Sequence, residues 1–348
     1  MAMKTVVALP GEGIGPEVVD ATCDLLMGTG LPLKILTPPQ GSPLPEETKR
    51  AAREADGVLF GAAGPSTSPV VSWLRWEMAA WAGVRPIRFF PGMRSPLADP
   101  DGIDYVLLRE NSEGLYGREG DLADLVRLMP DLHDRTGRTV KDFGTEGRFA
   151  VKIVTPRGAE RIARFACDLA RRRQARGKPG KITCVTKSNV LPRTDGLYDE
   201  IVGRVVREAG LTFEHFHVDD AARRLVRFPK AMDVVLCMNL YGDILSDLGA
   251  ETAGGLGLAP SANFGDNWAY FESVHGSAPD IAGKGIANPT ATILSAALML
   301  EHMGLGAEAQ RLEAAVGRVY RDGKVLTPDQ GGSARTRDLA QAVLAAYR

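Results

Sequence analysis

Short runs of β-branched and apolar residues alternate with segments of helical period along much of the chain. The run KTVVALP (4–10) predicts a strand, and Pro16 suits the first turn of a helix that ends at Gly28 or Gly30. The same pattern predicts helices over 45–56 and from about Pro156, and strands over 33–38, 57–63, 104–110, 148–155, 181–187, 213–219 and 232–239. Such alternation is typical of an α/β fold with largely parallel strands.

Residues 117–147 interrupt this alternation. They are polar, charged and rich in Gly and Asp, and they have no sustained period. Two structures fit such a segment equally well: an arm-like insertion that packs on a partner, or a solvated loop. The chain contains no internal repeat or low-complexity linker, so two domains would be joined through a common sheet.

The charge balance excludes some partners. Lys and Arg number 42, and Asp and Glu number 43, among 348 residues. No basic excess favours nucleic acid or an anionic membrane, so a bound anion must be held by a local cluster of cations. No apolar run is long enough to span a membrane, and the first residues lack the pattern of a signal peptide. The cysteines form no CxxC pair, which favours reduced thiols and a cytoplasmic location (Cys23, Cys167, Cys184, Cys237).

A glycine-rich turn, GEGIG (11–15), follows the first predicted strand and opens the first helix. This is a position where a phosphate could bind. However, Pro16 stands where the Rossmann dinucleotide motif has its third glycine, and the second predicted strand ends in Thr37 and Pro38 without an acidic residue for the ribose. We therefore interpret the turn as a tight strand-to-helix connection and not as a Rossmann fingerprint.

The segment PGEGIGPEVV (10–19) resembles the opening of the β-decarboxylating dehydrogenases, the family of isocitrate, isopropylmalate, homoisocitrate and tartrate dehydrogenases. Glu12 departs from the aspartate usual in that family, and the resemblance covers nearly the whole chain. It implies a two-domain open α/β sheet of the isopropylmalate-dehydrogenase type, with the active site in the interdomain cleft. It also implies a cofactor-binding domain over 1–90 and 252–348, and a substrate, metal and dimerisation domain over 91–251.

Three arginines match motif positions of this family: Arg75 in WLRWE, Arg85 in VRP and Arg109 in LLRENSEGLYG. Planar guanidinium groups bind carboxylates through paired hydrogen bonds, so a dicarboxylic substrate favours more than one arginine. The resemblance implies that all three bind the carboxylates of the substrate. Scattered structural salt bridges are the alternative.

Tyr116 and Lys187 are the candidates for proton transfer. Tyr116 lies seven residues after Arg109, and Lys187 precedes Ser188 and Asn189, similar to the family pattern K-[AS]-N. Burial beside a bound cation would favour the neutral, proton-accepting form of a lysine. The resemblance implies that Lys187 is the general base on the 2-hydroxyl, acting across a dimer interface. It implies that Tyr116 protonates the enolate left after carbon dioxide departs.

Asp243 and Asp247 stand four residues apart in NLYGDILSDLG, on one face of a predicted helix, where two like charges favour a positive neighbour. They could instead be solvated acids at a helix start, but Ile244 and Leu245 indicate a helix that faces the core. Asp219 ends another predicted strand, and an all-oxygen set suits Mg²⁺ or Mn²⁺. The resemblance implies that these three aspartates bind the metal, which supplies Lewis-acid chemistry, and that Asp219 comes from the neighbouring subunit.

Residues 271–289 (FESVHGSAPDIAGKGIANP) form the most specific motif, and their mixture of small and polar residues predicts a long, ordered, functional loop. In the family the matching loop binds adenosine, with His275 at the adenine and Asp280 at the ribose hydroxyls. A carboxylate there would repel a 2′-phosphate, which implies NAD over NADP. The residues that we expect to line the cofactor site are Ile14, Glu272, His275, Gly276, Ser277, Ala278, Asp280 and Asn288.

The substrate is less well defined. RENSEGLYG resembles the isocitrate, homoisocitrate and tartrate branches more than the isopropylmalate branch. The segment before Arg75 faces the variable 3-substituent of malate in this family. Here it offers hydroxyls for a carboxylate and apolar side chains for an alkyl group, in Ser68, Ser72, Val70, Val71 and Trp73. We expect NAD- and metal-dependent oxidative decarboxylation of a homoisocitrate- or isocitrate-like acid, with 3-isopropylmalate and tartrate or D-malate as alternatives.

A non-catalytic regulatory subunit of the same fold is the contrasting hypothesis. Such a subunit would be expected to lack metal ligands or the base, whereas this chain has Tyr116, Lys187, Asp219, Asp243 and Asp247. We therefore expect a homodimeric enzyme with a shared active site that binds a small hydroxy acid.

Overall fold

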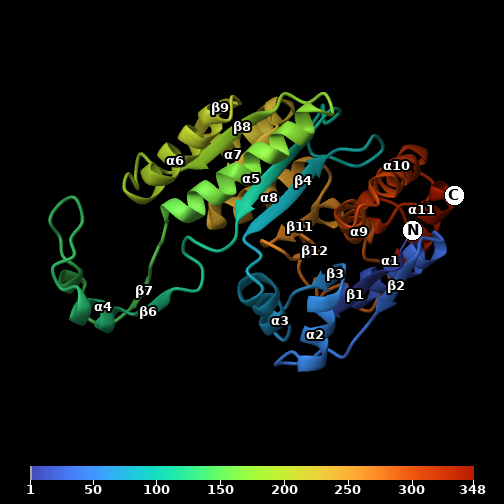
Figure 1. The fold of residues 1–348 in the computed structure, drawn as a ribbon, viewed down its shortest axis with the longest axis horizontal. Helices are drawn as coiled ribbons and strands as arrows, with labels where there is room; N and C mark the ends of the chain where they lie inside the picture. The colour runs from blue at the N-terminus through green and yellow to red at the C-terminus, as the bar shows by residue number, and fades with distance from the viewer. Residues whose placement is uncertain (1) are drawn as a thin grey trace.

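The computed structural model describes residues 2–348, and within this range ten strands form one mixed sheet (Figure 1). The order of the strands is β2-β1-β3-β12-β11-β4-β5-β10-β8-β9. Their bounds are β1 (Lys4–Gly11), β2 (Leu33–Leu36), β3 (Gly57–Ala62), β4 (Ala82–Arg88), β5 (Asp104–Glu110), β8 (Lys181–Thr186), β9 (Thr212–His217), β10 (Val234–Cys237), β11 (Pro260–Phe264) and β12 (Ala269–Ser273).

Strand direction reverses in the middle of this sheet. β2, β1, β3 and β12 run parallel to one another, and β5, β10, β8 and β9 form a second parallel block. Between the blocks, β11 is antiparallel to β12 and β4, and β4 is antiparallel to β5. The predicted α/β fold with largely parallel pairing is confirmed. The sequence pattern missed β4, β11 and β12, and the first residues of the predicted loop 271–289 belong to β12.

Helices cover both faces of the sheet (Figure 1). α9 packs on β11, β12 and β3, and α5 packs on β5, β10 and β8. α8 lies on the opposite face of β5 from α5. Gly242 and Gly249 of α8 adjoin Arg109 and Tyr105, whereas α5 contacts Asp104. Tyr105 and Arg109 point to one face of the strand and Asp104 points to the other. The bounds are α1 (Gly15–Gly28), α2 (Glu46–Glu54), α3 (Ser68–Ser72), α5 (Pro156–Gln174), α6 (Thr194–Glu208), α7 (Val218–Arg227), α8 (Asn239–Thr252), α9 (Thr290–His302), α10 (Gly306–Asp322) and α11 (Thr336–Tyr347).

The start of α5 agrees with the prediction. The Thr155 hydroxyl accepts a hydrogen bond from the backbone of Gly158 at 3.1 Å, and Pro156 occupies the first turn. The strand predicted over 148–155 is wrong for most of its length, because only β7 (Arg148–Ala150) is a strand. Residues 151–155 lie outside the main sheet. Ile153 there forms one isolated β-bridge, to Gly114.

The segment that interrupts the α/β pattern projects from the body of the molecule (Figure 1). It contains β6 (Glu119–Asp121), α4 (Leu122–Leu128) and η2 (Val140–Phe143), and β7 follows it directly. Within residues 2–348, β6 pairs only with β7. Several large apolar side chains of this arm are exposed by 46% to 67%, namely Leu128, Met129, Leu132 and Phe143.

All four cysteines are free thiols in the described residues, and Cys167, Cys184 and Cys237 are buried, as predicted for reduced core thiols. None of the helices in residues 2–348 is long and apolar enough to cross a membrane.

Glu17, in the first turn of α1, joins distant parts of the chain. Its carboxylate accepts hydrogen bonds from the backbone N–H groups of Gly285 at 3.1 Å and Ala287 at 2.8 Å. The hydroxyl of Thr336, the first residue of α11, donates to the same carboxylate at 3.1 Å. One acidic side chain therefore fastens both a long loop and the last helix to α1.

Replacing Glu17 by alanine should loosen the loop while leaving the sheet folded. A hydrogen bond to a charged group contributes about 1.5–3 kcal/mol, so amide hydrogen exchange at Gly285 and Ala287 should quicken and the Tm should fall. Glu47→Ala is the matched control, because Glu47 is also an acid in the first turn of a helix but is exposed. Equal exchange rates in the two variants would contradict the role of Glu17.

Candidate active site

Arg85 and Arg109 lie side by side on the face of the sheet that α8 covers. Arg85 is on β4, and the register sets Arg109 of β5 opposite Gly83, two residues from Arg85. Side chains two residues apart on a strand share one face, so the two guanidinium groups converge. Arg85 is 5% exposed and Arg109 is 1% exposed, which means that both charges need partners inside the protein.

Asp243 of α8 is the common partner of these arginines. Its carboxylate accepts hydrogen bonds from Arg109, from Arg85 at 3.3 Å and from the hydroxyl of Tyr116 at 2.6 Å. Burial acts to raise the pKa of Asp243, but Arg109 and Arg85 outweigh it and hold that pKa below its usual range. The expectation of positive charge beside the aspartates of this helix is confirmed.

Tyr116 keeps its proton in this arrangement. Burial, together with the neighbouring Asp243 carboxylate, raises the pKa of Tyr116. The guanidinium carbon of Arg109 lies 5.3 Å from the centre of the Tyr116 ring. The phenol is thus a protonated donor at neutral pH, which suits the predicted role of an acid.

Two further residues of α8 orient the arginines, and sequence analysis missed both. The Asn239 side-chain oxygen accepts hydrogen bonds from Arg109 Nε at 3.0 Å and Nη2 at 2.7 Å, and Ser246 contacts Arg85. Asn239, Asp243 and Ser246 follow an i, i+4, i+7 spacing and therefore share a helix face. This spacing of polar residues around Asp243 is the signal that could have identified them.

Asp247 lies one turn after Asp243 on α8 and is exposed. Burial of part of its carboxyl raises the pKa of Asp247. Asp219 does not join this pair, since no set of three or more His, Cys, Asp or Glu within residues 2–348 is placed to hold one metal ion. That Asp219 serves the site of a neighbouring subunit stays a prediction. α8 faces the core through Leu245, as predicted, whereas Ile244 of the same run is 57% exposed.

Lys187 and Asp219, both expected to act across a dimer interface, contact each other through an ion pair. The backbone N–H of Lys187 donates to Asp195 at 2.8 Å, and Asp195 is fully buried. Tyr241 donates to the same carboxylate at 3.1 Å, and Lys152 forms an ion pair with it. Asp195 therefore fixes the end of β8 that carries Lys187. Sequence analysis did not identify this residue, whose only local signal is its place in the first turn of α6.

Arg75 approaches the site from η1 (Trp73–Glu77), a π-helical turn of the kind often found at functional sites. Its guanidinium lies 3.3 Å from the carboxylate of Glu272, which also accepts hydrogen bonds from Asn263 at 3.0 Å and Tyr270 at 3.2 Å. Glu272 was predicted in the cofactor loop, but it lies on β12 beside a predicted substrate arginine. Its contact with the cofactor stays a prediction.

The loop after β12 packs on the glycine turn. The Ile14 N–H donates to the Ser277 carbonyl at 2.9 Å, and a Cβ at Gly13 would lie 1.9 Å from that oxygen. Gly13 also has φ +64°, so only glycine allows this approach. His275 is 9% exposed; its Nδ1 lies 3.0 Å from the Gly276 carbonyl oxygen, and its Nε2 is buried without a hydrogen-bond partner in the described residues.

In the later part of this loop, Asp280 is exposed to solvent and Asn288 is hydrogen-bonded within the protein. Asp280 is exposed, close to Ala278, which has a positive φ of 38°. Asn288 is buried, and its amide donates to Tyr320 at 3.1 Å and to Asp329 at 2.9 Å. Asn288 therefore fastens the end of the loop, and its predicted contact with the cofactor remains untested.

The segment predicted to face the 3-substituent forms α3. Val70 and Trp73 are each 1% exposed, and Trp73 packs edge-on against Trp268 with ring centres 6.1 Å apart. The interpretation of these two residues as candidate substrate contacts is wrong, because the apolar core already covers them. Ser68 is exposed and Val71 is half-buried, so both can contact a small molecule.

Comparison with known proteins places the chain among dehydrogenases. The profile described as "Isocitrate/isopropylmalate dehydrogenase" matches residues 5–343. The 3-isopropylmalate/3-methylmalate dehydrogenase of Methanocaldococcus jannaschii is 43% identical, with 98% of each chain covered. The isocitrate/homoisocitrate dehydrogenase of Thermus thermophilus is 40% identical over 98% of this chain and 97% of its own length.

Among solved structures, the isocitrate dehydrogenase from Methylococcus capsulatus superposes with a TM-score of 0.86 at 37% identity, covering 99% of this chain and all of the other. The profile match and these identities extend over nearly the full length of the fold described above. The chain therefore belongs to the isocitrate/isopropylmalate dehydrogenase family, and it is an enzyme of the decarboxylating dehydrogenase class.

Proposed function

We propose that this enzyme uses NAD and a divalent metal ion to oxidise and decarboxylate a 3-substituted malate, giving a 2-oxo acid, carbon dioxide and NADH. The convergence of Arg85, Arg109 and Tyr116 on the carboxylate of Asp243 is the observation that carries the proposal. It brings together cations for substrate carboxylates, a protonated phenol and a carboxylate suited to a hard metal ion.

The arginines support the binding of an anionic substrate. Nε of Arg85 is buried and lacks a hydrogen-bond partner in the described residues. A buried donor without an acceptor costs about 1–3 kcal/mol, and an oxygen of the substrate would remove that cost. Asn239 orients the guanidinium of Arg109, and Glu272 orients that of Arg75. Three fixed guanidinium groups are more than a monocarboxylate needs, which favours a substrate with two or more carboxylates.

The donor chemistry fits Mg²⁺ or Mn²⁺. Asp243 and Asp247 would hold the ion in one chain, together with Asp219 of the partner subunit, giving oxygen ligands only. When bound, the ion supplies Lewis-acid stabilisation of negative charge on the substrate oxygen.

Lys187 and Tyr116 carry out different proton transfers. In this proposal Nζ of Lys187 takes the proton of the substrate 2-hydroxyl, and Tyr116 returns a proton to the carbon that loses carbon dioxide. The raised pKa of Tyr116 supports the second role, because the phenol keeps its proton until it is needed. Asp195 positions Lys187 through its backbone and touches none of the reacting atoms.

His275 and Asp280 support NAD as the cofactor. The free Nε2 of His275 is buried at the loop and offers a polar atom to a ring such as adenine. Asp280 is exposed and can accept hydrogen bonds from the two hydroxyls of a ribose, while its negative charge would repel a 2′-phosphate. Ile14, Gly276, Ser277 and Ala278 would line the same site through the backbone contacts described above.

A homodimer with shared active sites completes the proposal. Exposed apolar side chains on the arm, and Ile244 on α8 beside the predicted metal ligands, favour burial against a second copy. The arm is therefore better explained as a partner-binding element than as a solvated loop. The domain division at residues 1–90, 252–348 and 91–251 also belongs to this proposal. The free thiols support a cytoplasmic location.

The exposed face of α3 favours a carboxylate-bearing 3-substituent, as in isocitrate or homoisocitrate. Ser68 and Ser72 offer hydroxyl donors, and Val71 is the single apolar residue left after Val70 and Trp73 join the core. The second candidate is 3-isopropylmalate, which Val71 and the relative from Methanocaldococcus jannaschii favour.

A screen of NADH formation over malates with different 3-substituents tests the substrate. We expect a higher kcat/KM for isocitrate and homoisocitrate than for 3-isopropylmalate, 3-methylmalate or D-malate. Val71→Ser should lower the kcat/KM for 3-isopropylmalate by about 10-fold, because it removes an apolar contact, and should change that for isocitrate little. Excess chelator should stop turnover and Mg²⁺ should restore it. A preference for 3-isopropylmalate in the unmodified enzyme would select the second candidate.

Mixing two inactive variants tests whether the active site is shared. Lys187→Ala and Asp243→Asn should each lower kcat by about 10²-fold or more, because one lacks the base and the other a metal ligand. After co-expression, about half of the dimers are hybrids with one fully intact site each, so about a quarter of the normal activity should return.

The controls for this experiment are the two variants purified separately and mixed without subunit exchange, which should stay inactive. If Lys187 and Asp243 acted in a site formed by one chain, no hybrid would contain an intact site. Co-expression without recovery of activity would therefore overturn the shared site.

Asp280→Lys should reverse the cofactor preference. The change removes a charged acceptor of the ribose hydroxyls and introduces attraction to a 2′-phosphate, so the kcat/KM with NAD should fall by about 10- to 100-fold and that with NADP should rise. Lys284→Asp, an exposed charge change in the same loop, is the control. A preference of the unmodified enzyme for NADP would show that Asp280 does not hold the ribose.

A further inference from the structure

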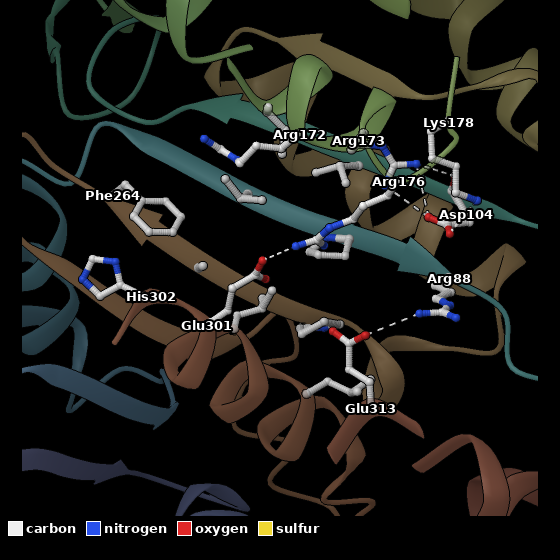
Figure 2. A pocket seen from close by; sticks show the side chains of 18 of the residues that line it. Arg88, Asp104, Arg172, Arg173, Arg176, Lys178, Phe264, Glu301, His302 and Glu313 are labelled. Atoms are coloured by element: carbon white, nitrogen blue, oxygen red, sulfur yellow. Dashed lines mark hydrogen bonds and ion pairs between the residues drawn. The ribbon is translucent and has the colours of Figure 1, made fainter. Parts of the chain in front are cut away.

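A groove of about 830 Å³ lies on the other face of the sheet from the candidate active site (Figure 2). Val84, Pro86 and Arg88 of β4 line it, whereas Arg85 of the same strand faces α8. Alternate residues of a strand point to opposite faces, so the groove and the active site share β4 but open on different sides of it.

The groove separates two sets of helices. α5 and the turn after it form one wall, and α9 and α10 form the other. One ion pair spans it, between Arg176 and Glu301 at the end of α9, and Arg88 of β4 lies 3.4 Å from Glu313 on α10 (Figure 2). The exposed guanidinium of Arg176 is thus held at the mouth of the groove by a single carboxylate.

Cations outnumber carboxylates along this groove. Five basic residues line it, with three acidic ones: Arg88, Arg172, Arg173, Arg176 and Lys178 against Asp104, Glu301 and Glu313. Arg173 and Lys178 are neutralised by Asp104, and Arg173 also by Asp233. Arg172 points into the groove and forms no ion pair with a residue of the described range (Figure 2). The positive charge that remains free is therefore that of Arg172, whereas Arg176 is paired with one carboxylate.

The floor of the groove is apolar. It is made by aliphatic and aromatic side chains from both walls and from the sheet, chiefly Phe165, Leu169, Phe264, Leu294 and Leu298. A small hydrophilic anion would leave this floor in contact with water, and a neutral apolar molecule would leave Arg172 unpaired. The volume lies within the range of about 300–1,000 Å³ typical of small-molecule sites.

We propose that this groove is a second ligand site, distinct from the active site, which binds an amphipathic anion: an aliphatic body on the apolar floor and a carboxylate or phosphate head on Arg172 and Arg176. The head group competes with Glu301 for Arg176, so removal of Glu301 should strengthen binding. Because the two walls come from different sets of helices, the occupant bridges them.

Calorimetric titration of the full-length protein with octyl phosphate, octanoate and octanol, in the presence of saturating NAD, tests this proposal. We expect the two anions to bind and octanol to bind at least 10-fold more weakly, because octanol lacks the charge. The combined Arg172→Gln and Arg176→Gln variant should bind the anions at least 10-fold more weakly. Glu301→Gln should bind them more tightly than the unmodified protein.

Arg171→Gln is the matched control, since Arg171 adjoins Arg172 in the sequence but does not line the groove. It should leave the affinity unchanged. The relative affinities of octyl phosphate and octanoate identify the preferred head group. Absence of anion binding, equal binding of octanol, or unchanged affinity in the double arginine variant would each overturn the proposal. So would displacement of the probe by the hydroxy acid substrate, which would place it in the active site.

Discussion

Burial of two guanidinium charges at the centre of the sheet is the constraint on which the site depends. Arg85 and Arg109 lose their water on folding, and an unpaired charge in that place would cost several kcal/mol. α8 supplies hydrogen-bond acceptors for both guanidinium groups from one face: the carboxylate of Asp243, the amide of Asn239 and the hydroxyl of Ser246. These contacts fix the position of α8 along β4 and β5. The same contacts fix Asp243 beside Tyr116, and stability and reactivity therefore rest on one network.

The sequence predicted strands well where an apolar run is continuous, and poorly where it is broken. β5 and β8 are buried except for their first residues, and apolar or β-branched residues form the middle of each strand. β4 contains Arg85 and Pro86, and β11 is short and contains Pro260, Ser261 and Asn263. The missed strands β4, β11 and β12 are thus neighbours in the middle of the sheet. Polar residues and prolines interrupt the apolar pattern in these strands, and this weakens the hydrophobic signal.

Resemblance to a family predicted site residues by position, but it did not predict which contacts orient them. The backbone of Lys187 donates a hydrogen bond to Asp195, and Glu272 forms an ion pair with Arg75. Both contacts depend on how the folded chain brings its segments together. Such contacts leave no local period to detect. Burial likewise separated Val71 from Val70 and Trp73, which single-sequence patterns treat alike. Whether an apolar side chain joins the core or lines a pocket depends on the folded sheet, and the local sequence pattern does not show it.

The order of strands in the sheet bears on how the protein is made. β5, β8, β9 and β10 arise from one continuous stretch and can pair while the ribosome still holds the rest. β3, by contrast, emerges early but must wait for β12, which is synthesised much later, and β4 must wait for β11. Until then the edges of β3 and β4 lack partner strands, and unpaired strand edges can associate with other chains. Contacts between residues far apart in the sequence also form slowly, so the N-terminal strands stay incompletely paired for longest during synthesis.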